Sequence, residues 1–130
     1  MKNFEQRIKN YLEERGLHQL RPSDIAKSIM IEGAELLENF QWENLSSQEI
    51  KDNPEKLKEV RKELADVMTY CFDMAVILDI DVEKMLNEKL DKVIEKYPKE
   101  LFNKNTVSEN PGTEDIYWKV KEDYRREKKN

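Results

Sequence analysis

Two pairs of acidic residues carry the strongest chemical signal in the sequence. Glu32 and Glu35 form the first pair, and Glu63 and Asp66 form the second. Residues three positions apart lie on one face of an α-helix, so each pair would present two carboxylates together. Apolar residues border both pairs, which predicts that the acids lie at the edge of the buried stripe rather than opposite it.

Four carboxylates on two packed helices would repel one another, and a bound cation would offset that repulsion. Donors that are all oxygen favour a hard ion, Mg²⁺ before Mn²⁺, and argue against Zn²⁺. Di-iron four-helix bundles need Glu-x-x-His pairs, and the only histidine is His18. The alternative is that these acids are solvated surface groups in a chain that has 28 of them. From the residues alone both interpretations stay open.

Basic and aromatic residues give weaker signals. Lys89 and Lys92 share a helical face, where they would hold phosphate oxygens or pair with surface acids. Trp42 follows the first acidic pair and would either join the core or stack on a nucleobase. His18 fits a local hydrogen-bonding role. Cys71 lies in an apolar run and is predicted to be a buried small hydrophobic residue.

The elements that must position these residues are helices. Apolar residues recur at spacings of three and four, with Pro22 and Asn53-Pro54 as start signals and Gly16 and Tyr97-Pro98 as stop signals. Helices are expected over residues 4–15, 22 to 40 or 42, 54–78, about 80–97 and 113–128, with a short helical turn near Ser47. A loop from Phe102 to Gly112 precedes the last helix.

Composition limits the fold and the function. The 130 residues include three Gly and four Pro, too few for many tight turns between strands, and 39% of the residues are charged. The net charge of −5 argues against nucleic-acid binding. A single cysteine excludes an internal disulfide, and the sequence has no long apolar run. One all-α domain in the cytoplasm, without a membrane partner, is therefore expected.

Three segments resemble a known family. They are Ile31 to Trp42 (IEGAELLENFQW), Lys62 to Val67 (KELADV) and Lys96-Tyr97-Pro98. Together they resemble the MazG-like all-α nucleoside triphosphate pyrophosphohydrolases, with the branch that contains the dCTP pyrophosphatases as the most similar. The resemblance spans roughly residues 18–98.

The resemblance implies a function for each matching residue. Glu32, Glu35, Glu63 and Asp66 would ligate Mg²⁺, and Glu35 would also take part in catalysis. Glu38 matches a further family acid that would orient the attacking water. Trp42 would stack on the base and Lys89 would meet the phosphates. Lys92 and His18 are further candidates for substrate binding.

Two positions depart from the family pattern. Leu17 stands where the family often carries a base-stacking Trp, and Val93 stands where it usually carries an Asn that contacts the nucleotide. Both changes remove groups that read the base or sugar and leave the metal ligands intact. The expected chemistry is therefore pyrophosphohydrolysis, with no assignment of dCTP as the substrate.

The sequence thus predicts an all-α, MazG-like four-helix bundle core at residues 1–110 and a helical extension at residues 111–130 that packs on the bundle or on a neighbouring subunit. The expected activity is Mg²⁺-dependent cleavage of a nucleoside triphosphate to a monophosphate and pyrophosphate, by a homodimer or homotetramer. The alternative is a non-catalytic helical protein that senses nucleotides or serves as an oligomeric scaffold.

Overall fold

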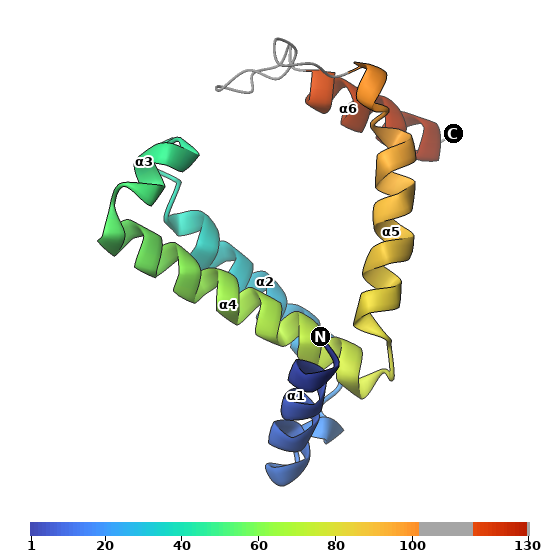
Figure 1. Ribbon diagram of the computed structural model, residues 1–130. Helices are drawn as coiled ribbons and strands as arrows, with labels where there is room; N and C mark the ends of the chain where they lie inside the picture. The colour runs from blue at the N-terminus through green and yellow to red at the C-terminus, as the bar shows by residue number, and fades with distance from the viewer. Residues whose placement is uncertain (102–115, 130) are drawn as a thin grey trace. The chain divides into compact units, whose positions relative to one another are not determined.

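The computed structural model describes residues 1–101 and 116–129, and these residues form helices and no strands (Figure 1). This confirms the all-α class. The α-helices are α1 (Lys2–Glu14), α2 (Pro22–Glu38), α3 (Ser47–Lys51), α4 (Pro54–Ile77), α5 (Val82–Lys96) and α6 (Ile116–Lys129), and the 3₁₀ helices are η1 (Leu17–Gln19) and η2 (Lys99–Leu101).

The chain divides into two compact units, Met1–Glu83 and Lys84–Asn130, whose relative placement is not determined. The predicted boundary between residues 110 and 111 and the loop from Phe102 to Gly112 lie outside the described residues, so the predicted domain division stays a prediction. Among the described helices, none has the length and apolar character needed to cross a bilayer. The cytoplasmic location also stays a prediction.

The start and stop signals of the helices act as the sequence predicts. Gly16 adopts a left-handed conformation with φ of 67° directly after α1, a conformation that glycine adopts without a steric penalty. Pro22 and Pro54 occupy the first positions of α2 and α4, where a missing backbone N–H costs nothing. The Asn53 side chain caps α4 by accepting a hydrogen bond from the Lys56 backbone N–H at 3.1 Å.

The connection between α2 and α4 is fixed locally by a capping box. The Ser46 hydroxyl accepts a hydrogen bond from the Glu49 backbone N–H, and the Glu49 carboxylate accepts one from the Ser46 backbone N–H at 2.7 Å. This arrangement starts α3 at the place where a short helical turn is predicted. The chain then reverses direction, so α4 returns alongside α2 as an antiparallel partner (Figure 1).

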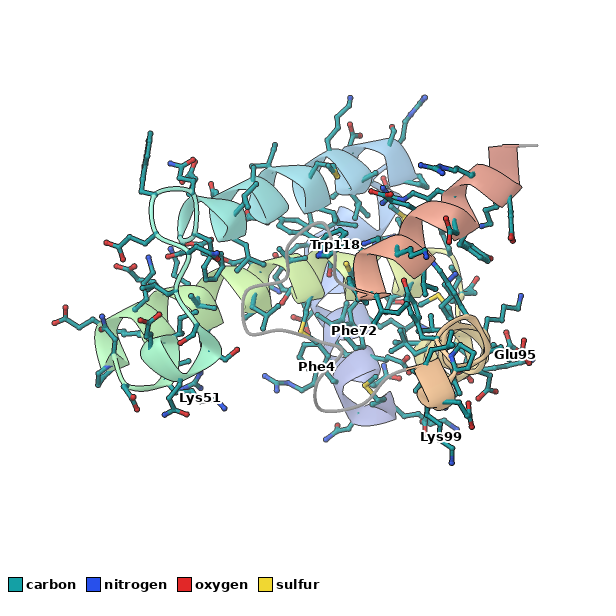
Figure 2. All side chains as sticks on the ribbon, turned by 90° about the horizontal axis from the view of Figure 1, so that it is seen from above. Phe4, Lys51, Phe72, Glu95, Lys99 and Trp118 are labelled. Atoms are coloured by element: carbon teal, nitrogen blue, oxygen red, sulfur yellow. The ribbon has the colours of Figure 1, made fainter. Side chains whose placement is uncertain are left out.

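A small hydrophobic core joins α1 to the C-terminal half of α4. The buried residues are Ile8, Leu12, Phe72, Ala75 and Val82, with Leu17, Val76 and Ile77 packed against them. Phe4 and Phe72 meet edge to face with ring centroids 5.0 Å apart (Figure 2). The Val82 backbone N–H donates a hydrogen bond to the Glu5 carboxylate at 3.2 Å, which ties the end of the α4–α5 turn to α1.

One flank of the α2–α4 pair exposes apolar side chains. Met30 and Leu37 on α2 and Leu64 and Met68 on α4 are between 45% and 72% exposed. Cys71 belongs to the same stripe and is exposed, so the prediction that it is buried is wrong. At about 100° per residue in two antiparallel helices, all five residues fall on one side of the pair.

In the second unit, α6 packs against the end of α5 through aromatic rings. Tyr97 and Tyr117 are stacked, with centroids 5.3 Å apart, and Tyr117 meets Trp118 edge to face. The Lys96 ammonium lies 4.1 Å from the centroid of the Tyr124 ring. The start of the last helix predicted at Thr113 lies outside the described residues.

Candidate metal centre

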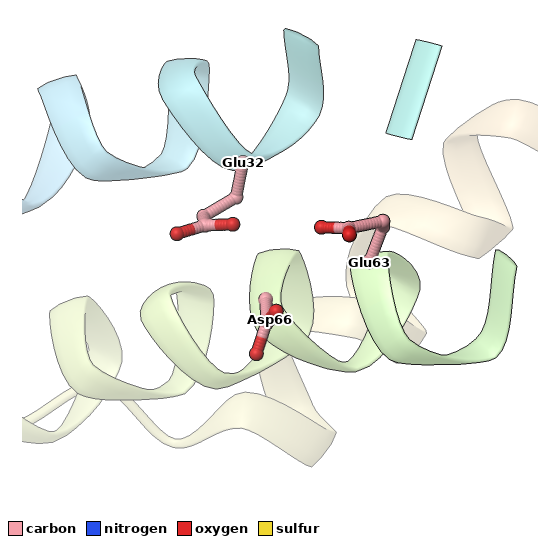
Figure 3. A group of neighbouring side chains, drawn as sticks. All are labelled: Glu32, Glu63 and Asp66. Carbon is pink, nitrogen blue, oxygen red and sulfur yellow. The ribbon is translucent and has the colours of Figure 1, made fainter. Parts of the chain in front are cut away.

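Three of the four predicted ligands come together between α2 and α4. Glu32 from α2 and Glu63 and Asp66 from α4 each offer a carboxylate oxygen, and these atoms all lie within 4.8 Å of one another. Figure 3 shows the side chains of Glu32 and Glu63 extending into the space between the two helices, with Asp66 beside Glu63 on α4. All three residues are half-buried.

Helical phase explains why these acids meet. The buried Ile25 precedes Glu32 by two turns, so the face of α2 that packs against α4 also carries Glu32. On α4 the half-buried Val67 and Tyr70 follow Glu63 on the same stripe. The acids therefore lie on the packed faces of their helices, as the bordering apolar residues predict.

The electrostatics of the cluster favour a cation. Oε2 of Glu32 and Oε2 of Glu63 are buried and accept no hydrogen bond within the described part of the chain. The pKa of Glu32 is raised above its ordinary value of 4.5, first by desolvation and then by its neighbours Glu35, Asp66 and Glu63. A buried acceptor without a donor is costly, and a bound cation would satisfy both oxygens.

The donor set fits a hard divalent ion. Three carboxylates without imidazole or thiolate are the ligands that Mg²⁺ and Mn²⁺ prefer in proteins. A bound ion of this class would neutralise the mutual repulsion of the three acids, with solvent or substrate oxygens as further ligands.

The fourth predicted ligand lies beside the group of three. Glu35 is exposed and close enough to Glu32 to raise the pKa of that carboxyl. It also lines a polar pocket of about 390 Å³ at the C-terminal end of α2. The other lining residues are Glu38, Asn39, Lys56, Glu59, Lys62 and Glu63. Glu63 belongs both to the lining of this pocket and to the acidic cluster, so the pocket adjoins the cluster.

The remaining candidates occupy different places. Trp42 follows α2 with 87% of its surface exposed, which disfavours the core alternative within one chain. His18 is exposed in η1, which precedes the N-terminal end of α2. Glu32 lies ten residues into α2, roughly 15 Å along the helix from that end. The structure therefore does not bring His18 to the cluster. Lys89 and Lys92 are exposed on α5 in the second unit.

Leu17 has a structural role of its own. Its side chain packs against the core formed by α1 and the end of α4. The position at which the family often carries a stacking Trp therefore contributes to the hydrophobic core of this chain.

The sequence pattern does not single out two lysines of the pocket and one buried acid farther along α4. Lys56 and Lys62 line the polar pocket, and Lys62 directly precedes Glu63, a proximity that the sequence already contains. Asp73 is only 6% exposed, and its Oδ1 has no hydrogen-bond partner among the described residues. Desolvation raises the pKa of Asp73. Its place in the apolar run from Tyr70 to Leu78 is the signal in the sequence that could have found it.

Comparison with known proteins agrees with this geometry. The profile of the MazG-like family matches residues 27–109, which include all three clustered acids and Glu35. Among solved structures, the chain is similar to a pyrophosphatase from Archaeoglobus fulgidus, with 33% sequence identity and a TM-score of 0.64. The match covers 76% of this chain and 93% of that chain. No curated protein matches the chain.

Proposed function

The chain belongs to the MazG-like family, and from this premise we propose that it is a metal-dependent nucleoside triphosphate pyrophosphohydrolase. The observation that carries the proposal is the meeting of Glu32, Glu63 and Asp66. Glu32 and Glu63 each have one buried carboxylate oxygen that accepts no hydrogen bond from the described part of the chain. The similarity to a solved pyrophosphatase supports the reaction class.

In the proposed reaction, water adds to the α-phosphorus of the nucleotide. The bond from that phosphorus to the oxygen bridging to the β-phosphate breaks, and pyrophosphate leaves with the bridging oxygen. Mg²⁺, or Mn²⁺ in its place, would supply positive charge for the phosphate oxygens and lower the pKa of bound water. Glu32, Glu63 and Asp66 would hold it, with Glu35 as a further ligand.

Two exposed acids are proposed to handle the water. Glu38 lines the pocket beside the cluster, where its carboxylate would orient the water and accept its proton. Glu35 would assist from the adjoining turn of α2. Trp42, with its ring exposed beyond α2, would stack on the base. Lys89 and Lys92 are proposed to contact phosphates, and His18 is proposed as a further substrate-binding residue.

We also propose that the protein acts as a homodimer or homotetramer. The apolar flank of α2 and α4 is the observation that supports this, because a contiguous exposed apolar patch typically marks an interaction surface. Glu35 and Asp66 fall on the other flank of the helix pair, so a partner seated on the apolar flank would leave the acidic pocket accessible.

The experiment that tests the function measures pyrophosphate release from a panel of ribonucleoside and deoxyribonucleoside triphosphates, with Mg²⁺ and with EDTA. Metal-dependent release of equal amounts of pyrophosphate and monophosphate is expected. The ranking of nucleotides would show what Leu17 and Val93 have done to base selectivity. A folded, oligomeric protein that turns over none of them would instead be a nucleotide sensor or a scaffold.

A further inference from the structure

Lys62 forms an ion pair with one of the clustered acids. Its Nζ lies 3.4 Å from Oε1 of Glu63, while the other oxygen of the same carboxylate, Oε2, is buried and accepts no hydrogen bond from any residue that the structure describes. The two oxygens of Glu63 therefore have different surroundings. Oε1 is paired with the lysine, and Oε2 is the oxygen without a hydrogen-bond partner among the described residues.

Lys62 is the solvent-exposed member of this ion pair, and Glu63 is the shielded one. The side chain of Lys62 is 73% exposed, whereas that of Glu63 is 15% exposed. Both residues line the polar pocket of about 390 Å³ that adjoins the acidic cluster. Lys62 and Lys56 are the two basic residues in that lining, against the four acids Glu35, Glu38, Glu59 and Glu63.

Metal binding would change the electrostatic situation of Lys62. In the metal-free protein the positive charge of the Lys62 ammonium is paired with the negative charge of Glu63 at 3.4 Å. A divalent ion on the same carboxylate would take up that negative charge and repel the ammonium. The ammonium would then need another anion within reach of its flexible stem.

We propose that Lys62 is a phosphate-binding residue of this site, which exchanges Glu63 for a phosphate oxygen of the nucleotide when metal is bound. This inference rests on the proposed function. A lysine is suited to the task because its compact charge and three donors adapt to different oxygen positions. Glu63 would hold Lys62 at the pocket before the nucleotide arrives.

The test measures binding without turnover. Calorimetry with an α,β-methylene nucleoside triphosphate, which cannot be cleaved at that bond, gives the analogue affinity in saturating Mg²⁺ for the wild type, Lys62→Gln, Lys62→Arg and Lys58→Gln. Lys58 is an exposed lysine one turn earlier on α4 and does not line the pocket, so its variant controls for net charge. A parallel titration measures Mn²⁺ affinity without nucleotide.

Lys62→Gln is expected to weaken analogue binding by about tenfold, while its Mn²⁺ affinity stays the same or increases. Lys62→Arg should keep most of the analogue affinity, and Lys58→Gln should match the wild type. Unchanged analogue binding in Lys62→Gln would overturn the proposal. A parallel loss of Mn²⁺ affinity would also overturn it, since Lys62 would then act only by orienting Glu63.

The turnover assay separates this inference from the proposed function. A wild type that binds the analogue through Lys62 but releases no pyrophosphate would refute the proposed enzyme and leave the phosphate-binding role standing. Full turnover together with wild-type analogue binding in Lys62→Gln would refute the role of Lys62 alone.

Discussion

Glu32 on α2 and Glu63 on α4 face each other across the packed helices, and each holds one buried carboxylate oxygen that no donor in the described structure satisfies. Burying two carboxylate oxygens without hydrogen-bond donors in one cluster destabilises the fold, and a bound cation would offset that cost. Carboxylate oxygens in this arrangement fit a preformed site for a hard cation.

Replacement of Glu63 by Gln should lower metal-dependent pyrophosphate release by at least ~100-fold. Loss of a residue that only supports a metal ligand lowers activity by about 10- to 100-fold, and loss of the ligand itself should lower it further. In EDTA the same variant should melt at a higher temperature than the wild type, since one of the repelling charges is gone. Glu55→Gln, which changes an exposed acid in the first turn of α4, serves as the control. Full activity in Glu63→Gln would refute the site.

The pH dependence of the metal-free protein should reflect Glu32. Its pKa in the folded state is raised above the ordinary 4.5, so between the two values the folded state binds more protons than the unfolded state. Stability in EDTA should therefore fall as the pH rises through this window. Metal affinity should rise over the same range, because the ion competes with the proton. Thermal melts of wild type and Glu32→Gln would check this, and an equal slope in both would contradict it.

Asp73 should be a source of instability at neutral pH. Burial raises its pKa above the ordinary 3.8, so the charged form is disfavoured in the folded protein. Asp73→Asn removes the buried charge and is expected to stabilise the fold by about 1 kcal/mol at pH 7, because burial penalises a charged group more than a neutral amide. The gain should vanish as the pH falls below 3.8, where Asp73 is protonated in both states. Chemical denaturation at two pH values measures it, and a destabilised variant at pH 7 would reveal an undetected partner.

Trp42→Ala should raise the KM for the preferred nucleotide about tenfold and change kcat less, because stacking holds the ground state and the transition state alike. The melting temperature should hardly change, since the side chain is 87% exposed. By contrast, Phe40→Ala, which removes a half-buried ring two residues earlier, should lower the melting temperature. An unchanged KM would mean that Trp42 does not contact the base.

Met68→Lys should dissociate the oligomer, because it places a charge in the middle of the apolar flank. Ile31→Lys is the matched control, as Ile31 is an exposed apolar residue on α2 outside that flank. Light scattering on both variants and on the wild type gives the masses. A wild type that is monomeric at micromolar concentration would refute the proposed assembly.

The sequence by itself determined the helices and the phase of each acidic pair. Proline and glycine act through fixed backbone preferences, and Ser46 and Asn53 cap helices through contacts three residues away. Such signals are local, so they can be recognised in the chain without its fold. The same holds for the spacing of Glu32 and Glu35 and of Glu63 and Asp66, and for the family resemblance, which the family match confirms.

Only the tertiary structure decided which carboxylates meet and what surrounds them. The rotation and axial offset of α2 against α4 depend on packing along both helices, and these place Glu32 with Glu63 and Asp66 while Glu35 stays exposed. The same packing buries Asp73 and exposes Cys71, although the residue types alone predict the reverse. Periodicity gives the direction of a side chain on its own helix, whereas its neighbours across the interface depend on how two helices fit together.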